Sequence, residues 1–560
     1  MSTTGILRSR RSAAQLHAIA SVEREIRAAD PVAGRKYLRD FQEAYRSYEK
    51  VLTATAVRRE IAEAGVTLIG DYHALPNSQR YLTSLLREHL SNRPLVLGVE
   101  TIFSRDQHIL DEWSRREIDE DEFRQRIRFE LDWGYDWTPF YEMLSVARDR
   151  GALICGLDCA PREDLRKIGA RDRHAADKIT ELRHLHPEAL ILVLFGESHL
   201  APQHLPALLA QRLPDEPLLT VLQNVDALYW RAAGEDRDHV EAVQVRKNVL
   251  CVFNATPLEK YENYRLCLDR WRSDRDQAPD LGPTLYNLID GMVRFLGINQ
   301  YSPHNTTQPR LLVDHMPEVY SRGSDSLLRR LLSRKGFSAE QRRSLAREAR
   351  ERGSAYLAPI NAVYVRQFRM TSSAEDATRF LHQACRGLPN FAHGKASPPV
   401  PDTQPSGRDD AFYVSIFEHA LAFFGSRILH PARPALRDSD IAELFDITRE
   451  DLEHQTSLPF PDAVEVLDFL IAHRAQDFRS IHRSARSRSN PETYLPVPAF
   501  EGHKYDYLVQ QLGYLTGTDL YDAYLDGRLA TTALRKLFLT HIEQPGVARA
   551  AYIQLKAKLR

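Results

Sequence analysis

Four short motifs end in residues whose side chains can do chemistry: GDYH, GVE, GLD and GESH. Their last residues are His73, Glu100, Asp158 and His199. Imidazole and carboxylate groups together can hold a divalent metal ion that activates water, or can serve as general acid and base without a metal. Glycine ahead of the polar residue lets the chain turn sharply and approach a ligand closely. We therefore predict one polar site in which His73, Glu100 and His199 are the catalytic or metal-binding residues.

An apolar run stands before each of these motifs. The runs cover residues 66–69, 95–99, 152–157 and 190–195, and a fifth covers residues 218–222. They are continuous rather than alternating, which is typical of strands buried on both faces. Segments with helical spacing separate them, at residues 78–90, 106–129, 138–150, 170–185 and 205–211. This alternation predicts an α/β fold with a mostly parallel sheet flanked by helices, to which residues 248–253 add an edge strand.

The sheet explains how residues far apart in the sequence would meet. Ligands of open parallel sheets bind outside the carboxyl ends of the strands, where all four motifs fall. Each motif alone is also typical of an ordinary strand-end turn with a hydrogen-bonding side chain, so the prediction rests on their convergence. The candidates for holding a cofactor at this edge are Asp71, Asp158, Arg162 and His174.

Three further features lie near the motifs. Residues 161–174 are rich in basic side chains, which favours either a clamp for an anionic ligand or a solvated loop and helix start. Ser198 follows a strand as in a nucleophile elbow, but Leu200 replaces the second glycine, so we expect a turn residue. A cluster of aromatic side chains at residues 133–137 is expected either to line a pocket or to pack a loop on the core. The basic residues are Arg162, Arg166, Lys167, Arg171 and Arg173, and the aromatic ones are Trp133, Tyr135 and Trp137.

The rest of the chain divides by composition. We predict a helical lead-in at residues 1–64, the α/β domain at 65–255, a helical region at 256–395, a proline-containing linker at 396–409 and a helical C-terminal region at 410–560. A short basic run at residues 479–488 is expected to be a surface loop. The helical half offers a surface for a protein partner.

Charge and segment composition exclude several classes of protein. Lys and Arg number 75 against 76 for Asp and Glu, so no global basic field is available for nucleic acid. No run approaches the roughly 20 apolar residues of a membrane helix, and no signal-peptide core follows the early arginines. The five cysteines form no disulfide framework or CxxC pair, and the first is Cys155. We therefore expect reduced thiols in a cytoplasmic protein. No P-loop, dinucleotide fingerprint or HExxH motif occurs.

The order of these motifs resembles a known family. Roughly residues 60–230 are similar to the ChaN-like haem-binding domain. The motifs that carry the resemblance are, in order, GDYH, GVE followed by Arg105 and Gln107, a W-x3-Y-x5-AR segment over residues 137–148, GLD-x2-PR and GESH. That family shares a superfamily with the Tiki proteases, TraB-like proteins and erythromycin esterases. Lipoprotein uptake members of the family carry an export signal, and here none is expected.

The resemblance implies a cleft lined by the GxxH and GxE motifs, with His73, Glu100 and His199 at the matching positions. It also implies a ligand such as haem, or a divalent metal ion as in the Tiki-like relatives, or a His and Glu pair that activates water as in the esterases. We therefore hold three functions open: a binding protein for haem or another small molecule, a hydrolase, and a non-catalytic scaffold. For Glu100 we expect burial to raise the affinity for a proton or a cation.

Overall fold

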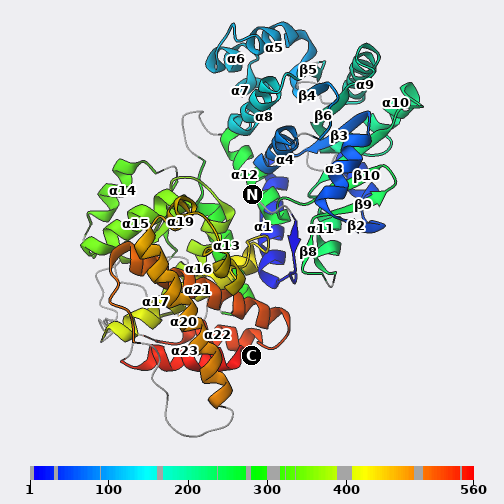
Figure 1. The fold of residues 1–560 in the computed structure, drawn as a ribbon. Coiled ribbons are helices and arrows are strands. Elements are labelled where there is room, and N and C mark those ends of the chain that lie inside the picture. The colour runs from blue at the N-terminus through cyan, green and yellow to red at the C-terminus, as the bar shows by residue number, and fades with distance from the viewer. Residues whose placement is uncertain are drawn as a thin grey trace. The chain divides into compact units, whose positions relative to one another are not determined.

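The computed structural model describes residues 5–30, 36–88, 90–159, 168–235, 237–272, 279–298, 316–321, 323–334, 336–386, 407–484, 496–542 and 545–559 (Figure 1). The chain divides into two units, which we treat separately. The α/β unit comprises Met1–Arg11 and Ile19–Gln277, and the helical unit comprises Ser12–Ala18 and Ala278–Arg560. Helix α1 (Ala13–Ala29) therefore begins in the helical unit and ends in the α/β unit.

The α/β unit is built on an eight-stranded sheet of order β2-β9-β10-β7-β3-β6-β4-β5. All pairs from β10 to β5 are parallel, whereas β9 pairs antiparallel with both β10 and β2, so the predicted mostly parallel sheet is confirmed. The segment predicted as an edge strand, β10, lies inside the sheet, because β9 and β2 extend the sheet beyond it. The strands are β2 (Lys50–Leu52), β3 (Val66–Asp71), β4 (Leu95–Phe103), β5 (Leu153–Asp158), β6 (Leu190–Gly196), β7 (Leu218–Gln223), β9 (Ala242–Arg246) and β10 (Val249–Val252).

Helices cover both faces of this sheet. One face packs against α3 to α8, and the other against α2, α9, α10 and α11. A small antiparallel pair, β1 (Ile6–Leu7) with β8 (His239–Val240), stands apart from the large sheet. The helices are α2 (Lys36–Ala44), α3 (Ala54–Glu63), α4 (Pro76–Arg87), α5 (Gln107–Ser114), α6 (Glu120–Arg126), α7 (Phe129–Asp132), α8 (Trp137–Asp149), α9 (Ile168–Leu185), α10 (Leu205–Arg212), α11 (Asp226–Ala233) and α12 (Pro257–Arg272), with 3-10 turns η1 (Ser104–Asp106) and η3 (Glu197–Leu200).

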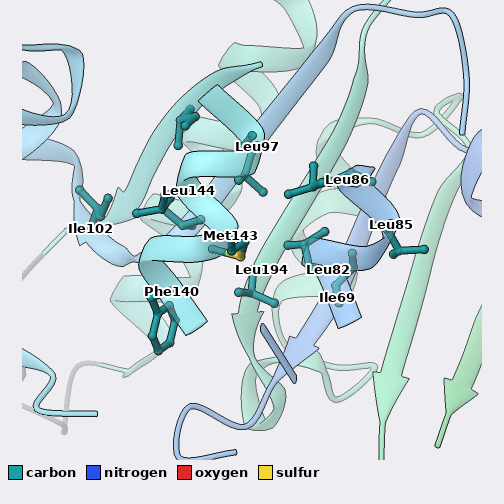
Figure 2. Packing of buried hydrophobic residues seen from close by; sticks show 14 of the residues in the cluster. Ile69, Leu82, Leu85, Leu86, Leu97, Ile102, Phe140, Met143, Leu144 and Leu194 are labelled. Atoms are coloured by element: carbon teal, nitrogen blue, oxygen red, sulfur yellow. The ribbon is translucent and has the colours of Figure 1, made fainter. Parts of the chain in front are cut away.

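The two-sided cover explains the continuous apolar runs. Ile69 of β3 packs with Leu82 of α4 and Met143 of α8 on one face, as Figure 2 shows. Its neighbour Leu68 joins Ile179 of α9 on the other face. Successive side chains of a strand point to opposite faces, so both must be apolar when both faces are covered. The strand ends are thereby held rigidly, which fixes the position of the polar residues that follow them.

The helical unit confirms the predicted helical C-terminal region. Its long helix α17 packs against α16, α21 and α23. A three-stranded sheet of order β11-β13-β12 was not predicted, because strands of three or four residues leave too short an apolar pattern. The elements are α13 (Gly282–Leu296), β11 (Glu318–Tyr320), α14 (Asp325–Leu332), α15 (Ala339–Arg352), β12 (Ser354–Leu357), β13 (Ala362–Val365), α16 (Met370–Arg386), α17 (Arg408–Leu429), α18 (Asp438–Glu443), α19 (Arg449–Thr456), α20 (Phe460–Ser484), α21 (Gly502–Leu525), α22 (Thr531–Leu539) and α23 (Val547–Lys558).

Some predictions fall on residues outside the described part of the chain. They concern residues 396–406 of the predicted linker and residues 485–488 of the basic run. Among the described helices, none is long and apolar enough to cross a membrane. All five cysteines are free thiols.

Candidate functional site

Glu100 of β4 is the centre of a buried polar cluster. The Arg171 guanidinium donates from Nη2 to Glu100 Oε1 at 2.6 Å, and the backbone N–H of Gly196 donates to Oε2. His73 Nε2 lies 3.6 Å from Oε2, and His199 Nε2 lies 3.8 Å from Oε1. Two imidazoles from different strand ends therefore face one carboxylate, at distances slightly too long for direct hydrogen bonds.

The sheet brings these groups together. Strands β3, β6 and β4 are adjacent, and Asp71 at the end of β3 is paired in register with Gly196 at the end of β6. A Cβ atom on Gly196 would lie 2.9 Å from Glu100 Oε2 and 3.4 Å from His73 Nε2. Glycine is therefore required here because the three side chains approach its backbone closely, and the predicted role of the glycines in these motifs holds at Gly196.

Each imidazole is backed by an aspartate. His73 Nδ1 lies 2.6 Å from Asp71 Oδ2, and His199 Nδ1 is bonded to Asp172 Oδ1. A carboxylate only accepts hydrogen bonds, so Nδ1 carries the proton in both rings. The Nε2 atoms that face Glu100 are then the ones that can take up or release a second proton. This is the arrangement by which an aspartate orients a catalytic histidine and stabilises its protonated form.

Neighbouring side chains hold the two aspartates in place. The amide of Gln79 in α4 donates to Asp71 Oδ1, and the hydroxyl of Tyr37 in α2 donates to Asp172 Oδ2 at 2.9 Å. The sequence did not single out Tyr37 or Gln79, because a single polar residue on a distant helix carries no local signal.

Arg171 of α9 joins the cluster to Asp158 of β5. Its Nε and Nη2 donate to the two oxygens of Asp158 at 2.9 and 2.7 Å. Although burial disfavours its charge, Glu100 and Asp158 raise the pKa of Arg171 above its usual range. The interpretation of Arg171 as a clamp for an external anion is therefore wrong, because the guanidinium is occupied by the protein's own carboxylates.

The pKa of Glu100 is set by opposing effects. Burial acts to raise it, as the sequence suggested, but His73, Arg171 and His199, with the Gly196 N–H, together hold the pKa of Glu100 below its usual range. Burial thus acts on the proton affinity of Glu100 in the expected direction, but the charged neighbours outweigh it, and the expected affinity for a cation stays a prediction. Glu100 is an ionised carboxylate, so it stabilises positive charge on the imidazoles and does not itself donate a proton at neutral pH.

The cluster holds more carboxylates than guanidiniums. The carboxylates of Asp71, Glu100, Asp158 and Asp172 lie around the single guanidinium of Arg171, an excess of negative charge that favours a bound cation. Arg171 and the Gly196 N–H each donate to one oxygen of Glu100, and each oxygen keeps a further lone pair for a proton or a cation. Within the described ranges, no three His, Cys, Asp or Glu side chains are placed to hold a metal. The metal-binding role expected for His73, Glu100 and His199 stays a prediction.

The remaining candidates lie in different places. His174 Nε2 is 2.9 Å from Ser104 Oγ, and His174 forms no hydrogen bond or ion pair with the other site residues that the structure describes. Arg162 lies outside the described residues. Ser198 is half-buried in η3 and forms no hydrogen bond with a described histidine, so the geometry matches the expected turn residue.

The predicted aromatic group packs on the core and also borders the site. Trp133, Tyr135 and Trp137 are all buried. The ring centroids of Trp133 and Tyr135 lie 5.4 and 5.1 Å from that of His73. His73 is the more accessible imidazole, with 11% of its side chain exposed against 4% for His199.

Comparison with known proteins places this geometry in context. Residues 57–192 match the family described as haem-binding uptake, Tiki superfamily, ChaN. A solved structure described as cofacial haem binding to ChaN of Campylobacter jejuni is 17% identical, with 36% of this chain and 93% of that chain covered and a TM-score of 0.25. No curated protein matches. On the strength of the family match over residues 57–192, the α/β region of this chain is ChaN-like.

Proposed function

We propose that the α/β unit hydrolyses a small-molecule ester or amide with His73 and His199 as its acid and base. The observation that supports this is the pair of aspartate-backed imidazoles whose Nε2 atoms face Glu100 at 3.6 and 3.8 Å. Positioned imidazoles of this kind contribute about 100-fold to 10,000-fold to proton-transfer steps. The proposed location in the cytoplasm and the absence of a nucleic-acid partner remain predictions.

In the proposed reaction the more accessible imidazole acts on water. His73 Nε2 takes a proton from water, and the resulting hydroxide attacks the carbonyl carbon of the substrate. Collapse of the tetrahedral intermediate breaks the bond to the leaving group, which takes a proton from protonated His199 Nε2. Glu100 stabilises whichever imidazole is charged, and Asp71 and Asp172 keep both rings in the tautomer that this transfer needs.

Haem binding is the second candidate, and the family match supports it. The α/β region matches a family described as haem-binding uptake, and His73 lies beside the rings of Trp133 and Tyr135. An imidazole is a common axial ligand of haem iron. In this alternative His73 would bind the iron and the two rings would pack against the porphyrin.

The test uses three histidine variants of the full chain. His73→Gln and His199→Gln should each lower the rate on a panel of ester and amide substrates by about 100-fold or more. His186→Gln is the control, because His186 is a partly buried histidine of the same unit that lies between α9 and β6, at the opposite end of β6 from Gly196. It should retain the activity of the unmodified protein.

A haem titration of the same proteins separates the two candidates. The hydrolase proposal is overturned if the unmodified protein cleaves nothing in the panel, or if the His186 control loses as much activity as the other variants. The second candidate is favoured if the unmodified protein shifts the Soret band of added haem, His73→Gln does not shift it, and no substrate of the panel is hydrolysed.

A further inference from the structure

An arginine-rich hollow lies in the helical unit, outside the region that matches the ChaN-like family. We name it the arginine groove. It has a volume of about 720 Å³ and is formed by α14, α15 and the residues Ser457 and His503. This size is within the range of small-molecule sites, about 300–1,000 Å³. Its charged lining residues are Arg329, Arg342, Arg343, Arg347, Arg350 and Glu351.

The charge of the groove departs strongly from that of the chain. Five arginines against one glutamate give a formal charge of +4, whereas the whole chain carries −1. Arg343, Arg347 and Arg350 follow one another at spacings of four and three along α15, so they share one face of the helix. Like charges at this spacing destabilise a helix, and a bound anion would relieve that repulsion.

Most of these arginines have no acidic partner. Among the residues that the structure describes, the exposed guanidiniums of Arg342, Arg343 and Arg350 form no ion pair, whereas Arg347 pairs with Asp506 at 2.7 Å. The five N–H donors of each of these three guanidiniums are therefore directed to solvent or to a ligand.

An adjoining cavity in the same unit shows the contrast. It has a volume of about 700 Å³ and shares Arg347, Glu351 and His503 with the groove. Its deeper arginines are each paired with the buried carboxylate of Glu375, at distances of 2.6 to 2.9 Å, and two of them pair with Glu348 as well. They are Arg352, Arg379 and Arg433. The three deeper arginines of the inner cavity therefore have carboxylate partners, whereas Arg342, Arg343 and Arg350 of the groove form no ion pair with a described residue.

We propose that the arginine groove binds a small ligand carrying two or more phosphate groups. Guanidinium groups bind phosphate oxygens in pairs of parallel hydrogen bonds, and several arginines on one helix face suit several linked phosphates better than one. A nucleotide and an inorganic polyphosphate share this chemistry. The proposal does not depend on the hydrolase site, because the groove lies in the other unit.

Calorimetric titration of the full chain with tripolyphosphate tests the proposal. We expect saturable binding that is stronger than that of orthophosphate or citrate and that weakens as salt screens the charges. The double variant Arg343→Gln, Arg350→Gln should bind about tenfold or more weakly, since each charged hydrogen bond lost costs a measurable share of the affinity. A nucleoside triphosphate and a nucleoside titrated in parallel distinguish the two phosphate sources.

A matched control separates a site from general charge attraction. Arg294→Gln with Arg330→Gln removes the same charge from exposed positions of the same unit that do not line the groove. The proposal is overturned if tripolyphosphate does not bind, if the control variant loses as much affinity as the groove variant, or if an RNA oligonucleotide binds far more tightly through the same arginines. Thermal unfolding of both variants checks that they fold, and tripolyphosphate should raise the melting temperature of the control variant only.

Discussion

Gly196 links the backbone of β6 to the chemistry of the site. Its N–H donates to Glu100, and its missing side chain leaves room for both imidazoles. The motifs in the sequence identified the glycine and the polar residue after it, but not which side chains would fill the space. His199 belongs to the same segment as Gly196, but Glu100 and His73 come from β4 and from the residues after β3, so only the pairing of the sheet brings them to this glycine.

Replacement of Gly196 by alanine should damage the site specifically. The new Cβ would lie 2.9 Å from Glu100 Oε2, so the carboxylate and its partners must shift. We expect a loss of about 1–3 kcal/mol in the free energy of unfolding, the usual cost of overpacking, and loss of any activity that depends on His73 and His199. Urea denaturation and the substrate panel measure the two effects.

Gly70→Ala is the control for this change. Gly70 lies in the neighbouring strand β3, but a Cβ there would have ordinary contacts of 3.4 Å or more. The explanation by close approach fails if the two alanine variants lose stability and activity equally.

Asp172 and Arg171 show how far the sequence alone reveals a buried ion pair. They stand one helical turn before Ala175 and Ala176, which are fully buried, and both charges lie on the buried face of α9. The sequence analysis treated Arg171 only as part of a basic segment and did not predict that its charge is buried and paired. Which carboxylates and imidazoles would be the partners depended on the tertiary fold.

At the scale of elements, the strands with long apolar runs were predictable and the short ones were not. The five runs before the motifs and between the helices all became strands of the large sheet. The three-residue strand β2 and the small sheet of β11, β12 and β13 were missed, because pairing with a neighbour rather than local pattern makes them strands. The site was therefore predictable in outline, since it depends on the strands that the sequence marks clearly.

Helix α9 should tolerate loss of a charge on its exposed face and not on its buried face. Arg171→Met leaves the buried carboxylates of Glu100 and Asp158 without their cation. Breaking a buried pair in this way costs about 3–5 kcal/mol in the free energy of unfolding. Urea denaturation measures it against Arg173→Met, an exposed arginine of the same helix, for which we expect a change within about 0.5 kcal/mol. Equal losses in the two variants would contradict the buried-cluster explanation.

Helix α17 should make the helical unit sensitive to acid. Burial lowers the pKa of His419 to about 3 and that of His430, which follows the helix, to about 4. His419 faces the Arg379 guanidinium, with Glu375, Arg352 and Arg433 nearby. Both pKa values lie below the usual histidine value near 6.5, so their stabilising contribution is present above that pH and is lost as the pH falls.

The free energy of unfolding should therefore fall as the pH is lowered from about 6.5 to about 4, by up to about 1.4 kcal/mol per pH unit for each proton that only the unfolded chain binds. The melting temperature, measured across this pH range, should fall with it. Asp376 acts in the opposite direction, because burial raises its pKa to about 6. His419→Gln should flatten the dependence, whereas His454→Gln, a change at an exposed position of α19, should not. An unchanged slope in His419→Gln would rule out this histidine as the source.

For the whole molecule, the division into two units assigns a short N-terminal segment to the helical half. Ser12–Ala18 belong with Ala278–Arg560, although the sequence between them forms the α/β unit. The amide of Asn287 in α13 donates to the carbonyl oxygen of Ala18 at 3.0 Å, and Ala14 and Ala18 are fully buried. No local pattern could reveal this. The change in composition along the chain marks the start of the helical half only after the last predicted strand. That the two halves fold separately stays a prediction.

A fragment of residues 278–560 should therefore be less stable than the helical unit of the full chain, since it lacks the segment that covers α13. A Cβ on Gly291 of α13 would lie 3.1 Å from the carbonyl oxygen of Ala14, so the two helices are in close contact and their separation would expose apolar surface. We expect that a peptide of residues 8–20, added to the fragment, raises its melting temperature in a concentration-dependent way, because a ligand that binds only the folded state stabilises it. The same peptide with Ala14→Glu and Ala18→Glu should have no effect, since neither carboxylate can be buried unpaired against α13. A fragment that melts at the same temperature with and without the peptide would show that Ser12–Ala18 are dispensable, and that the helical unit begins at Ala278.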